Sequence, residues 1–366
     1  MLLRRKVCVA VVTILFLMLA SQSIQRRHFL LQSIIPVGRA MPNRGETEVE
    51  RTQPPASLTP DRFSTTSPPN IAQSEAKEQS VDYSQSCGCD EPCVSDLRER
   101  EWFRKRYDPK QQPILRESNN NFDPDALRWW LGLQQSSKDQ TIEKVMSEMF
   151  KVISPPTADF RPLPSRCRTC AVVGNSGNLR HSGHGNLINS HHSVLRMNKG
   201  TTQGFEKDVG NRTTHHFLYP ESAVDINPGV SLIFLPFKLR DLEWLTSALS
   251  TGQVKTTYMR VKERVAADKD KVLVVNPVFF KYVHDHWNEN HGRYPSTGML
   301  AIIFALHTCD QVSVFGYGAD KQGNWHHYWE KNRNAGAFRL TGVHSADFET
   351  QVIHQLAKDH KIRLYL

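Results

Sequence analysis

The chain has 366 residues, with 46 Lys and Arg against 37 Asp and Glu and a formal net charge of +9. This length excludes a mini-scaffold and leaves one large or two ordinary domains. Apolar residues make up 39% and the mean hydropathy is −0.49, which excludes a polytopic membrane protein. The excess of positive charge is spread along the chain, which argues against a nucleic-acid-binding surface and favours a small anionic ligand.

The first predicted element is a membrane anchor. Three cationic residues at positions 4–6 precede an apolar run that begins at Val7 and continues, less purely, to Ile24. A full span needs about 20 residues, but thin membranes early in the secretory pathway accept shorter ones, so a signal-anchor and a cleaved signal peptide both fit. Because no small-x-small cleavage site follows the apolar run, we favour a signal-anchor over residues 7–24, with a cytosolic tail at 1–6 and the rest of the chain in the lumen.

The next segment, residues 25–86, is predicted to be a disordered lumenal stem. From Met41 onward its composition shifts to Pro, Ser, Thr, Glu and Gln, with almost no large apolar residue. Such a segment buries too little apolar surface to offset the entropy of ordering it. We expect an extended tether, suited to O-glycosylation, in front of a domain at 87–366.

Cysteines and a sequon agree with a lumenal address for residues 87–366. The six cysteines beyond the tether form an even set, which favours disulfides in an oxidising compartment. Zinc is the alternative, because their close spacings could supply thiolates. Spacing does not choose among the disulfide connectivities that six cysteines allow. Asn211-Arg212-Thr213 is a candidate N-glycosylation site.

Residues 87–366 have the pattern of an α/β domain. Apolar strands are predicted at 171–173, 193–197, 216–219, 231–236, 271–276, 311–318 and 362–366, and helices at 127–133, 141–152, 239–249, 279–287, 297–307 and 348–360. Alternation of helices with nearly continuous apolar strands predicts a mainly parallel sheet covered by helices on both faces. In such sheets the ligand binds outside the carboxyl ends of the strands.

Two turns in this pattern favour an anionic or nucleotide ligand. "GNSGN" at 174–178 follows a buried strand, where glycines let backbone N–H groups approach a phosphate and asparagines reach ribose and base edges; a plain loop is the alternative. Ser296 or Thr297 can cap the next long helix, whose N-terminus favours an anion, and Gly298 permits close approach. An ordinary helix cap is the alternative there.

Two histidine-bearing loops complete the candidate site. His326 and His327, in "GNWHHYWE", stand among aromatic residues after a strand end, which suits a sugar or phosphate site; zinc binding is disfavoured because adjacent side chains rarely converge on one ion. His344 is followed closely by Asp347 and Glu349. A carboxylate on one ring nitrogen would fix the tautomer and raise the basicity of this histidine, as a general base requires, whereas a structural cap is the alternative.

Taken in order, these segments resemble the animal sialyltransferases, glycosyltransferase family 29. The long motif contains "CAVVGNSGNL", "VLRMNK" and "TTHHFLYPES", the short motif is "HGRYPSTGMLAIIFALHTCDQV", and "HHYW" and His344-x4-Glu349 match the third and very short motifs. "RWWLGLQ", "LPFK", "DLEW" and "AGAFR" make the chain most similar to the β-galactoside α-2,3-sialyltransferases of types 1 and 2. The resemblance extends from Arg128 to the C-terminus.

The resemblance implies a single catalytic domain with a Rossmann-like fold, a variant of the GT-A type. It also implies transfer of sialic acid from CMP-N-acetylneuraminate to the 3-hydroxyl of terminal galactose in Galβ1,3GalNAc of O-glycans and glycolipids, with inversion and without a metal or other cofactor. The alternatives are another acceptor or linkage within the family, or a non-catalytic lumenal glycan-binding protein. "DKD" at 268–270 mimics a metal-binding motif, but it lies in a charged run that indicates a solvated turn.

The resemblance also implies roles for individual residues. His344 would be the general base, His327 would bind the donor phosphate and support the leaving group, and Glu349 would have a supporting role. The other donor-binding residues would be Asn175, Ser176, Gly177, Asn198, Ser296, Thr297, Gly298 and Gly318, and the acceptor side would be formed by Gln134, Tyr258 and Tyr294. The implied disulfides are Cys170–Cys309, Cys89–Cys167 and Cys87–Cys93.

The implied location is the Golgi membrane, as a single-pass type II protein with a lumenal catalytic domain, and also secretion after cleavage of the stem. The expected partners are CMP-sialic acid, galactose-terminated glycoproteins and glycolipids, and the membrane itself. A homodimer is a further expectation. Nucleic acid is not an expected partner.

Overall fold

The computed structural model describes residues 87–90, 92–97, 100–134, 140–155, 157, 160–320, 323–331 and 342–366. All of these belong to the second of two units of the chain, Lys77–Leu366. The predicted tail, anchor and stem at 1–6, 7–24 and 25–86 lie outside the described residues, so those predictions stand as they are. Within the described ranges, no helix has the length and apolarity that a bilayer crossing requires.

The centre of the domain is a sheet of seven strands, all parallel, in the order β5-β4-β3-β2-β1-β6-β7. Strands β2 to β5 extend to one side of β1, whereas β6 and β7 extend to the other, so the strand order reverses between β1 and β6. That position is the topological switch point at which doubly wound sheets bind ligands. The strands are β1 (Thr169–Val173), β2 (Ser193–Met197), β3 (His215–Leu218), β4 (Ser231–Phe234), β5 (Val272–Val274), β6 (Gln311–Phe315) and β7 (Arg363–Tyr365).

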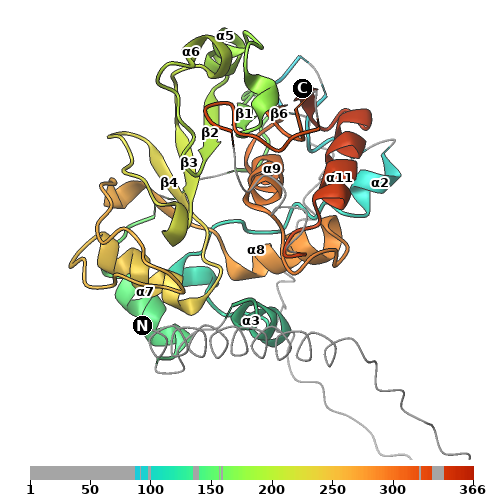
Figure 1. The fold of residues 1–366 in the computed structure, drawn as a ribbon. Coiled ribbons are helices and arrows are strands. Elements are labelled where there is room, and N and C mark those ends of the chain that lie inside the picture. Colours follow the sequence, from blue (N-terminus) through green and yellow to red (C-terminus); the bar gives the residue numbers. More distant parts are fainter. Residues whose placement is uncertain are drawn as a thin grey trace, which may run out of the picture. The chain divides into compact units, whose positions relative to one another are not determined.

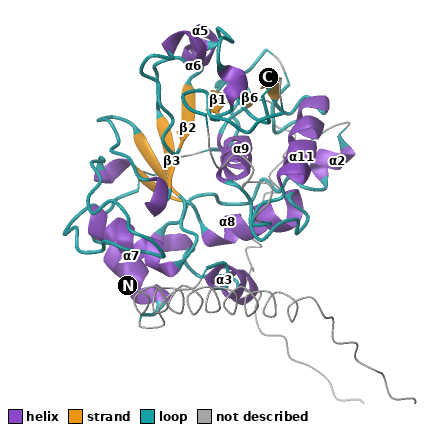
Figure 2. Cartoon of the chain, in the orientation of Figure 1, coloured by secondary structure: helices purple, strands orange, loops and turns teal. Residues whose placement is uncertain are grey.

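Helices cover both faces of the sheet (Figures 1 and 2). Val172 and the strand residues in phase with it pack against α8 and α9, while Val173 and its counterparts face α5 and α6, and the β4–β5 end of that face packs against α4 and α7. Alternate strand residues therefore enter different cores, as the pleat requires. The helices are α2 (Glu101–Arg104), α3 (Pro124–Leu131), α4 (Ile142–Phe150), α5 (Gly185–Ser190), α6 (Glu206–Val209), α7 (Leu239–Ala248), α8 (Pro277–Tyr282) with a π-helical turn at Val283–Trp287, α9 (Thr297–Thr308) and α11 (Ala346–Lys358).

The predicted α/β architecture with a parallel sheet and helices on both faces is confirmed. Several strand boundaries differ by one or two residues, and the largest difference is at β6, which ends at Phe315 and not at residue 318. Gly316 and Gly318 have φ of +70° and +84°, a left-handed backbone that an extended strand does not contain. Three short helices, α2, α5 and α6, were not predicted, since segments of four to six residues are too short to show helical periodicity.

Three disulfides brace the domain, and they join the pairs that the family resemblance implies. Cys170–Cys309 ties the central strand β1 to the residue that follows α9, and the other two, Cys89–Cys167 and Cys87–Cys93, hold the segment that enters the domain. The first closes a loop of 139 residues, which in the chain-entropy account stabilises the fold by about 4–5 kcal/mol. All six thiols beyond the tether are thereby used, which removes the zinc alternative for them.

A buried histidine predicts how stability depends on pH. His307 lies near the end of α9 against the rings of Tyr107, Phe279 and Tyr282, and burial lowers its pKa from 6.5 to about 4. The unfolded chain therefore binds a proton at this site that the folded chain does not bind between these two values. The free energy of unfolding is expected to fall by up to about 3 kcal/mol as the pH drops through this window.

The measurement is urea unfolding at about pH 7 and about pH 4.5 for the wild type and for His307→Phe, which keeps an aromatic ring in the packed site. We expect the variant to lose less stability than the wild type between the two pH values. An equal loss in both proteins would assign the acid sensitivity to other groups.

Candidate active site

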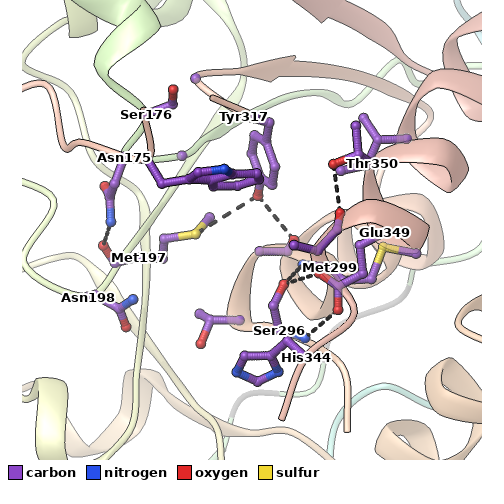
Figure 3. Close-up of a pocket in the computed structure, with 18 of the residues that line it drawn as sticks. Asn175, Ser176, Met197, Asn198, Ser296, Met299, Tyr317, His344, Glu349 and Thr350 are labelled. Atoms are coloured by element: carbon purple, nitrogen blue, oxygen red, sulfur yellow. Dashed lines mark hydrogen bonds between the residues drawn. The ribbon is translucent and has the colours of Figure 1, made fainter. Parts of the chain in front are cut away.

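A cavity of about 300 Å³ opens at the switch point, outside the carboxyl ends of the strands. Its walls come from the turn after β1, the end of β2, the residue after β3, the start of α9, the turn after β6, the loop at 325–327 and the start of α11. In Figure 3, Asn175, Ser176 and Asn198 stand on one side, and Ser296, His344 and Glu349 on the other. Segments up to 179 residues apart thus meet where the strand order predicts a ligand.

The turn after β1 is held against the turn after β6. Gly174 donates its N–H to Phe315 O at 2.8 Å, and a Cβ on Gly174 would lie 2.4 Å from Gly316 O, so only glycine allows this approach. Gly177 donates its N–H to His326 O at 2.8 Å. Gly177 therefore connects the long motif to the loop of His327, and it is not among the residues that line the cavity.

Two asparagines present unused acceptors to this cavity. Asn175 donates through Nδ2 to Met197 O at 3.2 Å, and Asn198 is held in a left-handed conformation, φ 55°, by His216, whose Nε2 lies 2.6 Å from the Asn198 carbonyl. The Oδ1 atoms of both are buried and accept no hydrogen bond from the described part of the chain. A buried acceptor without a donor is costly, so both amides are arranged for a ligand that carries N–H or O–H groups.

The N-terminus of α9 forms the opposite wall. Ser296 caps the helix by accepting from the Met299 N–H at 3.1 Å, and Ser296, Thr297 and Gly298 all line the cavity. A Cβ on Gly298 would lie 2.9 Å from the Tyr317 ring, so glycine is needed for the ring to reach the Gly298 carbonyl. Free N–H groups and the helix dipole at this end favour a phosphate.

Glu349 binds this helix terminus and not His344. Its buried carboxylate accepts from the Ser296 N–H at 2.8 Å, from Ser296 Oγ at 2.5 Å and from Asn288 Nδ2 at 3.1 Å. Three donors on one carboxylate fix its position at the helix terminus. The very short motif is thereby attached to the short motif through Ser296.

His327 is oriented by its own loop. Its Nδ1 lies 3.0 Å from Glu330 Oε1, its ring stacks on Trp329 at 4.6 Å, and its backbone pairs with Ser176. The hydrogen bond from His327 lowers the pKa of the Glu330 carboxyl, so Glu330 is a carboxylate and Nδ1 carries the proton. Nε2 of His327 is then the nitrogen that can donate to a phosphate when the ring is protonated.

His344 has its tautomer fixed by a backbone carbonyl. Nδ1 of His344 lies 2.9 Å from Tyr294 O, and the two rings meet edge to face at 5.1 Å. Because a carbonyl only accepts, Nδ1 must carry the proton and Nε2 keeps its lone pair. The sequence suggested Asp347 or Glu349 as the orienting group. Glu349 is instead engaged by Ser296 and Asn288, and the His344 ring is oriented through its hydrogen bond to Tyr294 O.

The expected acceptor residues lie beside this cavity. Gln134, Tyr258 and Tyr294 do not line it, but Gln134 Nε2 donates to the Tyr294 hydroxyl at 3.2 Å, and Tyr258 is 66% exposed. Lys238 lies between them, with Nζ 3.0 Å from Gln134 Oε1 and 4.9 Å from the centre of the Tyr258 ring. The three residues thus converge from three distant segments on one side of His344.

Comparison with known families shows to which family the chain belongs. Residues 114–361 match the model of glycosyltransferase family 29 (sialyltransferase), which is more than half of the chain. The chain belongs to the sialyltransferase family. It is therefore a glycosyltransferase, and the matched range contains every residue of the cavity.

Named relatives of this sialyltransferase include two kinds. The CMP-N-acetylneuraminate-beta-galactosamide-alpha-2,3-sialyltransferase 2 of Mus musculus is 52% identical over 280 residues, which cover 76% of this chain and 80% of the mouse protein. The sialyltransferase 1 of the same series from Homo sapiens is 48% identical over 282 residues, or 76% and 82% of the two chains. The similarity is thus of comparable size to both kinds.

Solved structures of mammalian sialyltransferases have the same fold. One is 46% identical with a TM-score of 0.70 and covers 77% of this chain and 99% of its own. Another, in complex with Gal-beta-1-3GalNAc-ortho-nitrophenol, is 45% identical with a TM-score of 0.69 and covers 76% and 98%. Both confirm the fold of the catalytic domain.

Several cavity residues of this sialyltransferase were assigned no role from the sequence. Tyr219, Tyr317 and Trp325 line the cavity, and burial raises the pKa of Tyr219 to about 12 and that of Tyr317 well above 10, so both phenols stay neutral. Tyr219 follows β3, and Tyr317 stands between the two glycines after β6. Their position after parallel strands was the one available clue, because ligands bind at those ends.

The "DKD" segment is an exposed turn in front of β5. Asp268 accepts from the Gly229 N–H at 2.9 Å, and 269–271 form a 3₁₀ turn. It stands at the amino end of β5, whereas the cavity is at the carboxyl ends. In the ranges that the structure describes, no group of three or more His, Cys, Asp or Glu side chains is arranged to hold a metal ion.

Proposed function

We propose that this enzyme transfers sialic acid from CMP-N-acetylneuraminate to the 3-hydroxyl of a terminal galactose in Galβ1,3GalNAc, forming an α-2,3 linkage with inversion. The observation that carries the proposal is that one cavity joins two unsatisfied asparagine oxygens and a helix N-terminus to a histidine whose reactive nitrogen is defined by the Tyr294 carbonyl. The first two fit a nucleotide monophosphate, and the third fits a hydroxyl nucleophile. Relatives named as alpha-2,3-sialyltransferases support the linkage.

The proposed reaction is a direct displacement that needs no cofactor. The galactose O3 attacks the anomeric carbon of sialic acid while the bond from that carbon to the phosphate oxygen breaks, and CMP leaves with the electron pair. Nε2 of His344 takes the hydroxyl proton. His327 and the first N–H groups of α9 stabilise the charge that develops on the phosphate. Attack opposite the leaving group inverts the anomeric centre.

The test is a screen of CMP-sialic acid against Galβ1,3GalNAc, Galβ1,4GlcNAc and gangliosides, with the linkage identified by a sialidase specific for α-2,3 bonds. We expect the highest kcat/KM with Galβ1,3GalNAc. The proposal is contradicted if the enzyme transfers sialic acid to none of the galactose-terminated acceptors. Transfer to N-acetylgalactosamine or to a second sialic acid would favour the alternative of another acceptor or linkage.

Catalysis is proposed to need no metal, because a monoester phosphate can be stabilised by one histidine and a helix N-terminus. Activity in excess EDTA is therefore expected to equal activity in its absence to within about twofold. The measurement is the initial rate with and without chelator. If the chelator lowers the rate and added Mn²⁺ restores it, the "DKD" turn at residues 268–270 becomes a candidate metal site.

We also propose the Golgi membrane as the location, with residues 7–24 as a type II anchor. The support is the cationic residues in front of the apolar run and the disulfides of the domain, which form in an oxidising lumen. Extraction with alkaline carbonate tests the anchor. The full chain is expected in the membrane pellet, and release to the soluble fraction would support a cleaved signal peptide instead.

A further inference from the structure

A buried lysine connects the three residues on the acceptor side. Lys238 precedes α7 at the carboxyl end of β4 and is 2% exposed. Its Nζ lies 2.6 Å from Asp241 Oδ1 and 3.3 Å from Glu221 Oε1, and both of these carboxylates are buried. We name Lys238, Glu221 and Asp241 the Lys238 cluster. Buried ions are kept only when they are paired, so this cluster has a defined geometry.

Lys238 determines which way the Gln134 amide points. Its ammonium has only donors, so the Gln134 atom 3.0 Å from Nζ must be the oxygen. The amide nitrogen is then directed to the Tyr294 hydroxyl, 3.2 Å away. Without the lysine, the two ends of the amide could exchange by rotation, and the Tyr294 hydroxyl would meet an acceptor in place of a donor.

The same cluster holds the loop of Tyr258. Glu221 accepts from Lys238 and also from the hydroxyl of Thr257, the residue before Tyr258. Lys238 Nζ lies over the Tyr258 ring at 4.9 Å, a cation–π contact for a side chain that is otherwise 66% exposed. Lys238 therefore holds Tyr258 in two ways, through Glu221 and Thr257 and through direct contact with the ring.

We propose that Lys238 is a positioning residue for the acceptor sugar, acting through Gln134 and through the loop of Tyr258. This inference rests on the proposed function. It adds a determinant of acceptor binding that is separate from the donor cavity, since Lys238, Gln134 and Tyr258 do not line that cavity.

The experiment compares Lys238→Met/Asp241→Asn with the wild type. The pair of changes removes Lys238 together with the carboxyl group nearest to its Nζ, so the buried Asp241 carboxyl is not left without its cationic partner. We expect KM for Galβ1,3GalNAc to rise about tenfold or more, which is the scale of a lost hydrogen bond to a charged group, while the Kd for CMP stays within twofold. Lys262→Met, which removes a lysine of the exposed pair with Asp225, is the matched control.

A double-mutant cycle with Gln134→Leu separates positioning from general support of the fold. If Lys238 acts through Gln134, its replacement changes acceptor KM much less in the Gln134→Leu background. Fully additive effects, or an unchanged acceptor KM in the folded double variant, overturn the proposal. If the methionine variant does not fold, Lys238→Arg replaces it, because arginine keeps the charge but displaces the donors. An unchanged acceptor KM in Lys238→Arg would likewise overturn the proposal.

Failure of this inference is distinguishable from failure of the proposed function. If the wild type transfers to no galactose-terminated acceptor, the function is wrong. If it transfers normally and the Lys238 variants bind the acceptor as the wild type does, only the inference is wrong.

Discussion

His344→Ala is expected to abolish sialic acid transfer, with a loss in kcat of about 10³-fold or more, while CMP binding stays within a few-fold of the wild type. The hydrogen bond from Nδ1 to Tyr294 O leaves Nε2 as the proton acceptor, and alanine provides none. The groups that we propose to bind the donor, Asn175, Asn198 and the α9 terminus, do not depend on this ring. The measurement is kcat at saturating donor and acceptor, together with calorimetric titration of CMP.

A matched control is His354→Ala, which removes an exposed histidine from α11, the helix that starts just after His344. This control is expected to keep kcat within about twofold, as substitutions at exposed positions usually do. Near-normal kcat in His344→Ala would refute the assignment of the base. Equal losses in both variants would mean that damage to the fold, and not the missing proton acceptor, lowers the rate.

His327→Ala is expected to lower kcat by about 10²- to 10³-fold, the usual size of the loss when one donor to a developing negative charge is removed. The loss has a different origin from that of His344, because it falls on the leaving group. His327→Ala should therefore also slow the hydrolysis of CMP-sialic acid by water in the absence of acceptor. The measurement is release of CMP with and without Galβ1,3GalNAc.

Glu330→Gln provides a graded comparison for that assignment. It keeps an acceptor near His327 Nδ1 but removes the negative charge that holds the ring. An intermediate loss, smaller than that of His327→Ala, is expected in both transfer and hydrolysis. If His327→Ala leaves hydrolysis at the wild-type rate, His327 does not stabilise the leaving group.

The contacts of His344 and Glu349 show what the sequence alone could not predict. His344 and Glu349 were both identified from a short spacing, and both reach the cavity. His344 Nδ1 donates to the main-chain carbonyl of Tyr294, and a main-chain contact cannot be predicted from the type of residue that makes it. Glu349 accepts from Ser296 and Asn288, which lie on other segments. Gly177 was likewise recognised as part of the nucleotide turn, but it pairs with the backbone of His326 outside the cavity wall.

The parallel α/β fold, the family and about half of the cavity residues could be predicted without the structure, because apolar periodicity and short motifs are local and survive in the linear order of residues. Which atom of each side chain is used follows only from contacts between distant segments. The Asn175 oxygen is left for a ligand because its nitrogen is taken by Met197, and Gln134 is oriented by Lys238, 104 residues away. Such contacts are set by the strand order and by packing between distant segments, and no spacing in the sequence encodes them.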